Sequence, residues 1–517
     1  MRASPTRLLG AICAAALALA IAPAVASATS SQTEIDIAIA KASDWIRDQQ
    51  EADGSIPGFG GDWSATALAA AGVDASQVRT APGAPSFQDY LLGEYADPAW
   101  AGDPVFSVTD YERATLVSYA AGLDPSRISA ESNLPAQIAG LWNSATGSFG
   151  SPGTNASAFG VLALRTTPVP RWALAPTVTF LRSTQHDDGG WTWSGSTSQA
   201  SREEPSETDM TGSVVAALCE AGVPTYDADL AAALTYLRGE LVDSTGGFEY
   251  VWGEPSADVN AWVVSGLTAC GIDPQSAAWT TTAGKTPIDF LLSQQEASGA
   301  FTYAGSGNLY STQSALRAIA GGVFTATPPS ERATPQVAAG TPVPHALAIE
   351  LAPGNVRMCK VTAPAGAALT AVLEAAKGSG SYPSGCIRSL AVTDGEVTAV
   401  DGVSPSGSGE SWLARLDRGA AAVAGQQAVG FGDVISLWLG ATPASTQPVV
   451  GPTGPAGAAG PAGKQGKRGK QGKRGRRGKP GRNATIVCKV KKNRAGKSKT
   501  RCFVKQPQGK KSGKARK

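Results

Sequence analysis

The chain has 517 residues, of which 42% are hydrophobic and 17% charged, and its formal net charge at pH 7 is only +2. It contains two histidines, His186 and His345, which argues against histidine-rich metal centres and Ser-His-Asp catalytic sets. After the N-terminal region, no run of residues is apolar enough to predict a transmembrane helix.

The N-terminal region, residues 1–28, has the pattern of a secretory signal peptide. Arg2 and Arg7 precede an apolar stretch at 8–22, and Ala26-Ser27-Ala28 forms a small-residue cleavage site. The apolar stretch is too short to span a bilayer. We therefore expect a secreted, extracellular protein.

The small net charge hides a strong asymmetry along the chain. Residues 464–517 hold 23 of the 44 basic residues and no acid, whereas residues 29–463 hold 19 bases against 42 acids, a net charge of about −23. Such a tail is attracted to anionic envelope polymers or lipid headgroups. It has no interleaved aromatic residues for stacking bases, so no specific nucleic-acid partner is expected. We predict retention at the cell surface.

Six cysteines remain after the signal peptide, which contains Cys13. An even number in an exported protein indicates disulfides, although sequence does not establish their connectivity. No Cys-x-x-Cys spacing favours a metal site. The local pairs are Cys219 with Cys270, Cys359 with Cys386, and Cys488 with Cys502.

Two phrases repeat between residues 34 and 322. One ends a helix in an apolar pair and continues with Gln, acidic residues, two glycines and an aromatic, as in Phe180–Trp191; weaker copies start at Trp45, Leu141, Tyr236 and Phe290. The other ends a small-residue helix in Ala-Gly-apolar-Asp, as at Ala121–Asp124, with a glycine that suits a left-handed helix cap. The capping glycines are Gly72, Gly122, Gly222, Gly271 and Gly321, and one copy is degenerate near 166–168.

A period of about 50 residues predicts six helix pairs. The helices that end in the glycine caps are rich in small residues and would form an inner ring, with the larger, more charged helices outside it. We therefore predict an (α/α)6 toroid, with an open solenoid as the alternative. Cys219 and Cys270 fall at nearly equivalent positions of consecutive inner helices, where a disulfide would join neighbours.

Residues 34–322 resemble the prenyltransferase/squalene-cyclase α/α-toroid repeat family, through the Gln185-to-Trp191 phrase and its copies. The resemblance implies the toroid fold. The superfamily includes terpene cyclases, protein prenyltransferase β-subunits, thioester complement domains and cobalamin carriers, so the fold does not decide the function.

A proline-rich linker is expected at 323–344, and a small β-rich (α+β) domain at 345–440. In that domain, 346–351 alternates as a strand, 367–377 suits one helix, and strands 411–416 and 432–438 flank a hairpin. Trp412, Asp417-Arg-Gly419 and Gly432–Ile435 resemble the C-terminal domain of the transcobalamin and intrinsic-factor family. The family has Asn-Gly where this chain has Arg-Gly.

After a second linker (441–450), glycine occupies every third position from Gly451 to Gly481, which predicts a collagen-like segment over 451–482. Its later triplets are strongly basic, so both a homotrimer and an extended single-chain stalk remain open. Residues 483–517 resemble a basic hairpin closed by Cys488 and Cys502. The tail as a whole is expected to be largely extended.

Catalysis finds little support in the sequence. The Asp-x-Asp-Asp run of the cyclases is absent: in Asp227-Ala228-Asp229 the final acid is replaced by Leu230, and helix N-capping explains the run better. The thioester Cys-Gly-Glu-Gln and a zinc-ligand set of Asp, Cys and His are also absent. We therefore assign no catalytic residue and no built-in cofactor.

The two resemblances together imply a ligand. Transcobalamin-like carriers hold a corrinoid between a toroid and a small β domain, and this chain has the same two parts in the same order. Some of these carriers donate a loop histidine to cobalt, which makes His186 a candidate metal ligand; a solvated His186 beside Asp187 and Asp188 is the alternative. The candidate ligand-binding residues are His186, Trp191, Trp193, Tyr250, Trp252, Tyr303 and Trp412. For Trp191 and Trp412, packing within the fold is the competing interpretation.

The sequence thus favours a secreted, envelope-associated, noncatalytic protein that captures a large ligand, with cobalamin as the first candidate. A terpene cyclase-like or prenyltransferase-like enzyme acting on an isoprenoid lipid is the alternative, and a structural surface adhesin comes third.

Overall fold

The computed structural model describes residues 29–97, 107–150, 153–198, 202–251, 253, 255–378, 386–442, 485–492 and 498–505. The predicted signal peptide, most of the second linker, the collagen-like segment and Trp252 lie outside these residues. The chain divides into two units, Met1–Ser445 and Thr446–Lys517. No helix in the described ranges has both the length and the hydrophobicity needed to cross a membrane.

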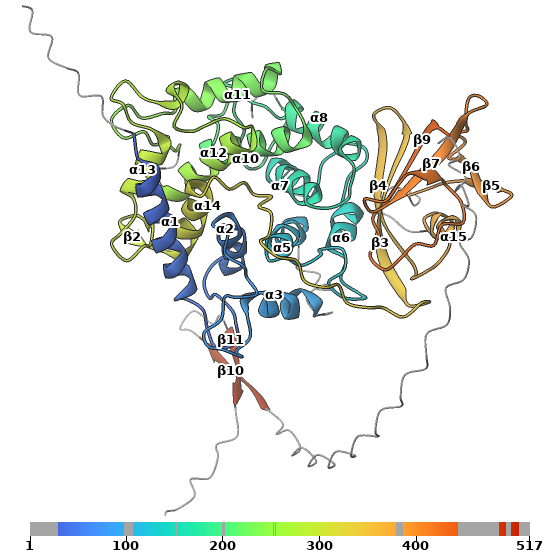
Figure 1. The fold of residues 1–517 in the computed structure, drawn as a ribbon, viewed down its shortest axis with the longest axis horizontal. Coiled ribbons are helices and arrows are strands. Elements are labelled where there is room, and N and C mark those ends of the chain that lie inside the picture. Colours follow the sequence, from blue (N-terminus) through green and yellow to red (C-terminus); the bar gives the residue numbers. More distant parts are fainter. Residues whose placement is uncertain are drawn as a thin grey trace, which may run out of the picture. The chain divides into compact units, whose positions relative to one another are not determined.

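Helices alternate between an inner and an outer layer in the first unit (Figure 1). The inner helices are α2 (Ser64–Ala70), α5 (Val108–Ala120), α7 (Gly153–Arg165), α10 (Thr208–Ala221), α12 (Ala257–Ala269) and α14 (Leu309–Ile319). The outer helices are α1 (Gln32–Arg47), α3 (Phe87–Ala96), α6 (Leu134–Gly140), α8 (Ala175–Ser183), α11 (Ala228–Gly239) and α13 (Pro287–Ser293). Short 3-10 helices occur at η1 (Gly61–Trp63), η2 (Arg171–Leu174) and η3 (Ala277–Trp279), and a small hairpin at β1 (Thr302–Tyr303) and β2 (Ser306–Gly307).

Each inner helix packs against the next one in the chain, and α14 packs against α2. The ring is therefore closed, which confirms the predicted toroid of six helix pairs over the open solenoid. Small residues allow the close packing: a Cβ added to Gly212 in α10 would lie 2.7 Å from the Cα of Val263 in α12. A disulfide between Cys219 and Cys270 joins the same two helices.

The glycine caps form one end of the ring, here called the cap end. Gly72, Gly122, Gly222, Gly271 and Gly321 have φ values between 67° and 97°. After four of them the apolar residue donates its backbone N–H to the carbonyl five residues earlier, as Leu123 does to Ser118 at 2.9 Å. In the degenerate copy, the hydroxyls of Thr166 and Thr167 satisfy the last carbonyls of α7 in place of a glycine.

The glutamine phrase forms the opposite end, the turn end, because all inner helices run in the same direction. Gln50, Gln185 and Gln295 each donate to the carbonyl of the turn glycine four residues on, at 2.7–3.1 Å. Each also donates to a carbonyl of the following repeat; for Gln295 this is Ala38 of α1, at 2.9 Å. The repeated glutamine therefore joins successive repeats, and the last copy joins the ring's two ends.

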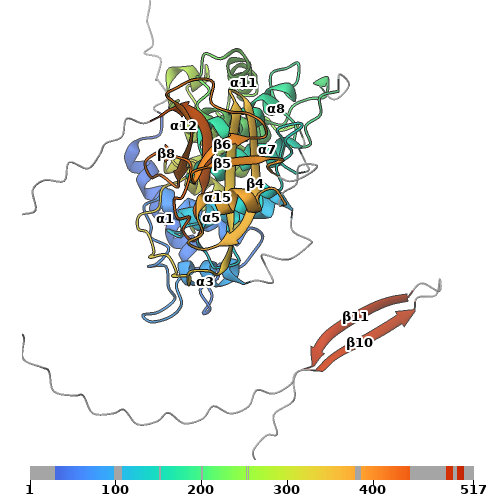
Figure 2. The ribbon, with the colours of Figure 1, turned by 90° about the vertical axis from the view of Figure 1, so that its right-hand side faces the viewer.

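A five-stranded sheet with the order β4-β3-β9-β7-β8 follows the ring. Its strands are β3 (Pro342–Ala352), β4 (Asn355–Pro364), β7 (Glu410–Leu416), β8 (Ala422–Val423) and β9 (Ile435–Ala441). Strand β9 pairs with β3 in parallel and with β7 antiparallel. Helix α15 (Leu369–Ala375) and the hairpin of β5 (Leu390–Thr393) and β6 (Glu396–Val400) accompany it (Figure 2).

The segment between ring and sheet differs in part from the predicted linker. Phe324 is only 1% exposed and belongs to the core of the ring, since its aromatic side chain packs there. At the other end, β3 begins at Pro342 rather than at residue 345. Prolines are tolerated here because this part of β3 pairs with β4 alone.

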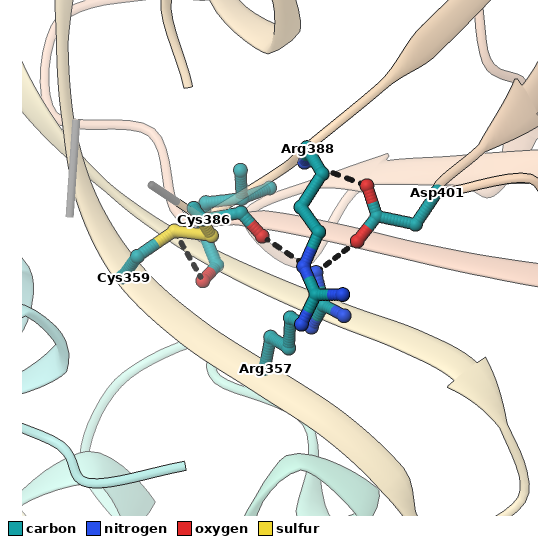
Figure 3. The surroundings of a disulfide bond; sticks show 6 residues. Arg357, Cys359, Cys386, Arg388 and Asp401 are labelled. Carbon is teal, nitrogen blue, oxygen red and sulfur yellow. Dashed lines mark hydrogen bonds and ion pairs between the residues drawn. A yellow bond between two sulfur atoms is a disulfide. The ribbon is translucent and has the colours of Figure 1, made fainter. Parts of the chain in front are cut away.

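Both faces of the sheet are covered. Leu347 and Ile349 of β3 face the core of the β domain, whereas Ala346 and Ala348 pack against the core of the ring. The small alanines let β3 lie close to α6, which it contacts. In the β domain, Cys359 and Cys386 form a disulfide next to the ion pair of Arg357 with Asp401 (Figure 3). Two disulfides fit an oxidising compartment.

In the second unit, β10 (Thr485–Lys492) and β11 (Ser498–Lys505) pair antiparallel. Cys488 lies directly opposite Cys502 in the backbone register, as a hairpin closed at these positions requires. Their side chains lie outside the described atoms, so this third disulfide stays a prediction.

Candidate functional site

His186 is buried, with an exposed fraction of 3%. Its Nδ1 lies 2.8 Å from the carbonyl oxygen of Glu204, and its Nε2 lies 3.4 Å from the hydroxyl of Thr192. The solvated side chain of the alternative interpretation is therefore not observed, because the backbone at Glu204, in the loop that follows the turn, lies against the imidazole. Both nitrogens have polar neighbours from the protein. Among the described residues, no group of three or more His, Cys, Asp or Glu could hold a metal ion.

Two of the predicted ligand-binding residues lie inside the protein. Trp191 is fully buried: its Nε1 donates to the carbonyl of Leu181 at 2.7 Å, and its backbone N–H donates to the hydroxyl of Thr211. Trp412 is also fully buried and donates to the carbonyl of Val403 in the β domain. Neither ring presents a surface to a ligand in this conformation. Both serve the packing of their own domains.

Three other predicted residues lie at the turn end of the ring. Trp193 is 53% exposed and Tyr303 is 57% exposed. Tyr250 is partly buried, and burial together with the nearby carboxylate of Asp209 raises its pKa to about 12. Ligand contact by these side chains stays a prediction, and Trp252 lies outside the described residues.

The interior of the ring is filled by aromatic side chains. Phe159 of α7 contacts Trp63 of η1 and Trp262 of α12, with ring centroids 6.0 and 5.6 Å apart. Because α7 is not a neighbour of α2 or α12 in the ring, these contacts cross its interior. Phe324 packs against both Phe159 and Trp262, and the guanidinium of Arg317 lies 4.2 Å from its centroid.

Sequence reasoning missed two buried carboxyl groups. Burial holds the pKa of Glu112 in α5 well above its ordinary value, and neither of its carboxyl oxygens has a hydrogen-bond partner. Burial, followed by the neighbouring carboxylate of Glu207, raises the pKa of Asp209 to about 6. A signal for Glu112 exists: it lies between Val108 and Leu116 at four-residue spacing, on the buried face of its helix.

The β domain is held to the ring by a partly buried arginine. Arg127, just after the cap of α5, pairs with Asp124 of the ring and with Asp417 and Asp433 of the β domain. Its Nε donates to the carbonyl of Phe431 at 2.8 Å. Burial opposes its charge, but the attraction of these carboxylates outweighs it and raises the pKa of Arg127.

A groove runs between the ring and the β domain at the cap end. It consists of two hollows, of about 320 and about 580 Å3, that share Tyr119, Pro168 and Arg418. The larger hollow, here called the arginine groove, is lined by Tyr119, Arg165, Thr167, Pro168, Val169, Pro170, Arg171, Trp172, Arg415, Arg418 and Trp438. None of the predicted site residues that the structure describes lines either hollow. Because the predicted loop residues belong to the turn end, they lie at the other end of the ring from the groove.

No family model matches this sequence, and no curated protein matches it. Among solved structures, the chain is similar to the type II terpene cyclase MstE from Scytonema, with 13% identity over 56% of this chain and 98% of that one, and a TM-score of 0.40. The same cyclase with its substrate geranylgeranyl dihydroxybenzoate gives 14% identity over 56% and 97%, at a TM-score of 0.37. Haptocorrin in complex with Cbi gives 11% identity over 80% of this chain and 99% of that one, at a TM-score of 0.33. A terpene cyclase and a transcobalamin-like carrier are thus the two kinds of neighbour, as the sequence motifs suggested, at scores that carry nothing about ligand or reaction.

Proposed function

We propose that this protein is a secreted, noncatalytic carrier that captures a large ligand in the groove between the ring and the β domain. The observation that carries the proposal is the groove itself, whose walls come from both parts: Tyr119 and Pro168 from the ring, and Arg418 from the β domain. Clefts between domains are favoured ligand sites, and each hollow falls within the usual 300–1,000 Å3.

The lining supports binding rather than catalysis. Among the described residues, the arginine groove is lined by no Asp, Glu, His, Cys or Lys side chain, and these residue types supply most general acids and bases. It does have Trp172 and Trp438, which offer flat apolar surface. A corrinoid is the ligand to test first, because the β-domain motif resembles the transcobalamin family.

The proposal is tested by mixing the purified protein with cobalamin and with cobinamide, and recording the visible spectrum and the melting temperature. A ligand that binds only the folded state raises the melting temperature by mass action. An unmoved melting curve at saturating corrinoid, with an unchanged spectrum, would contradict the corrinoid proposal. A Trp438→Ala variant should bind less tightly. A His186→Ala variant tests whether that side chain reaches cobalt, which would appear as a changed cobalt spectrum.

The alternative, an enzyme acting on an isoprenoid lipid, requires room for the substrate beside an acid. Phe159, Trp262 and Phe324 occupy the interior of the ring instead, in mutual contact. Incubation with geranylgeranyl diphosphate and analysis of the organic extract separates the two functions. A new cyclised or transferred product would favour the enzyme over the carrier.

The basic tail supports a second role, which is compatible with the first. We propose that residues 464–517 hold the protein at an anionic envelope surface, because 23 positive charges occur there without an acid. The full chain should sediment with phosphatidylglycerol vesicles at low salt and be released as salt rises, whereas a chain ending at residue 463 should stay in solution.

A further inference from the structure

The arginine groove contains four arginines without acidic partners. Arg165 and Arg171 come from the ring, at the end of α7 and in η2, and Arg415 and Arg418 come from β7 and the turn after it. Eight other arginines of the described residues form ion pairs with aspartates: Arg47, Arg79, Arg113, Arg127, Arg182, Arg202, Arg332 and Arg357. The four in the groove form none of these pairs. They differ in this from the eight paired arginines, within a region whose net charge is acidic.

The positive charges of Arg171 and Arg418 both act on Arg165. Burial, chiefly, lowers the pKa of Arg165, and the charge of Arg171 lowers it further. The carboxylate of Glu220 opposes this shift, and the charge of Arg418 adds a smaller lowering effect. In Arg415, the Nε is buried and has no hydrogen-bond partner. Burial and neighbouring positive charges both disfavour the charged form of a guanidinium group, and a bound anion favours it.

A structural role accounts for one of the four. The Nε of Arg165 donates to the carbonyl of Glu220 in the last turn of α10, at 3.1 Å, and a cation near a helix C-terminus is favourable. Arg171 and Arg418 have no such explanation. Both are exposed, and they approach the groove from opposite walls.

We propose that the arginine groove is an anion subsite that binds a phosphate, phosphodiester or carboxylate group of the ligand. Guanidinium groups match the geometry of these anions with paired N–H donors. The apolar body of the ligand lies against Trp172 and Trp438, which line the same hollow. The inference rests on the proposed capture function and narrows its ligand class to anionic amphiphiles.

Inorganic pyrophosphate is the direct probe, and an Arg171→Gln/Arg418→Gln variant is the test. Neither of the two side chains forms an ion pair within the described residues, so the variant should fold. With wild-type protein, saturating pyrophosphate should raise the melting temperature by about 2–4 °C, and added salt should reduce the rise. The double variant should lose most of this rise.

Two controls separate the groove from the basic tail and from general charge loss. An Arg47→Gln variant removes an exposed arginine outside the groove and should respond like wild type. A double Arg171→Lys/Arg418→Lys variant keeps the charge and should keep part of the rise. The tail is identical in all variants, so a difference between them reports the groove.

An equal pyrophosphate response in wild type and the Gln variant, or no response in either, would overturn the anion subsite. The same proteins titrated with cobalamin separate this failure from that of the carrier function. Equal cobalamin binding by wild type and the Gln variant would support the carrier function and contradict the anion subsite. A pyrophosphate response in wild type without binding of either corrinoid would support the anion subsite and contradict the corrinoid as the ligand.

Discussion

The two ends of the ring are built from the same six repeats but differ in how many of their polar side chains have hydrogen-bond or ionic partners. At the turn end, Gln50, Gln185 and Gln295 satisfy turn carbonyls and join each repeat to the next. At the cap end, the repeats supply glycine caps and local aspartates, and beyond them Arg171 forms no ion pair within the described part of the chain. Residues that recur in the repeats therefore stabilise the ring, whereas residues that do not recur form the candidate site.

The largest effect is expected where the turn end closes the ring. A Cβ added to Gly299, which has a φ of 100°, would lie 2.4 Å from the backbone carbonyl oxygen of Lys41 in α1. The Gly299→Ala change should therefore cost about 4 kcal/mol of unfolding free energy or prevent folding, since both backbones would have to move.

Gly271 at the cap end is the matched control. Its φ is 69°, but an added Cβ would meet no atom within 4 Å. Gly271→Ala should cost only about 1 kcal/mol, the cost of a left-handed alanine. Urea unfolding measures both, and equal costs would contradict the claim that the turn glycines are required for close packing.

The next effect concerns the contact between the cap end and the β domain. Replacing Arg127 by Gln leaves Asp417 and Asp433 without their cation. These side chains are 27% and 14% exposed, so about 3 kcal/mol should be lost. Amide hydrogen exchange in β3 should become faster, and ligand binding to the groove should become weaker.

An Arg47→Gln variant gives the comparison for Arg127. It removes the same charge from an ion pair with Asp44 whose side chains are 50% and 72% exposed, and such pairs contribute little. If both variants showed the same hydrogen exchange in β3, Arg127 would not be what holds the two parts together.

The fold was predictable because its signals are local. Each signal lies within a short stretch of sequence. These signals are the glycines at helix ends, the glutamine four residues before a turn glycine, and the small residues of the inner helices. Even the acid that ends three of the caps has a local reason: Asp74, Asp124 and Asp273 each accept a backbone N–H two residues later. Six such repeats of this length then predicted a closed ring.

The site was not predictable in the same way, because its partners are far apart in sequence. Arg127 meets Asp417 from a position 290 residues away, and the arginine groove combines side chains near 165–172 with others near 415–438. No motif marks these residues. The burial of His186 was not predictable for a similar reason, since the backbone beside its imidazole, at Glu204, comes from a loop without a recognisable pattern.

A smaller effect tests the glutamine at the turn end. Gln295→Ala removes the side-chain donor to the carbonyls of Gly299 and Ala38, which should cost about 2 kcal/mol for the two hydrogen bonds. The neighbouring Gln294 bonds only to side chains, those of Ser293 and Thr302. Gln294→Ala should therefore cost less than half as much in urea unfolding. A Gln295→Ala variant as stable as Gln294→Ala would reduce the repeated glutamine to a surface feature.

The smallest effect is a pH dependence at the turn end. The pKa of Asp209 rises from 3.8 to about 6 on folding because the carboxyl group is buried, chiefly, and lies near Glu207. Between these two values the folded protein holds more protons than the unfolded chain, so its stability falls as pH rises, and above pH 6 the full cost is present. Asp209→Asn should therefore stabilise the protein by about 1 kcal/mol at pH 7, after allowance for partial exposure, and give no advantage at pH 4. The asparagine keeps the oxygen that accepts the N–H of Met210, so the helix start is preserved.

Asp243 provides the opposite sign, because hydrogen bonds from the Thr282 hydroxyl and backbone lower its pKa. The stability that its carboxylate contributes is lost as pH falls. Thermal melts of both Asn variants across pH 4–8 measure the difference, and an Asp209→Asn curve parallel to wild type would show that this carboxyl group is as well solvated as those on the surface.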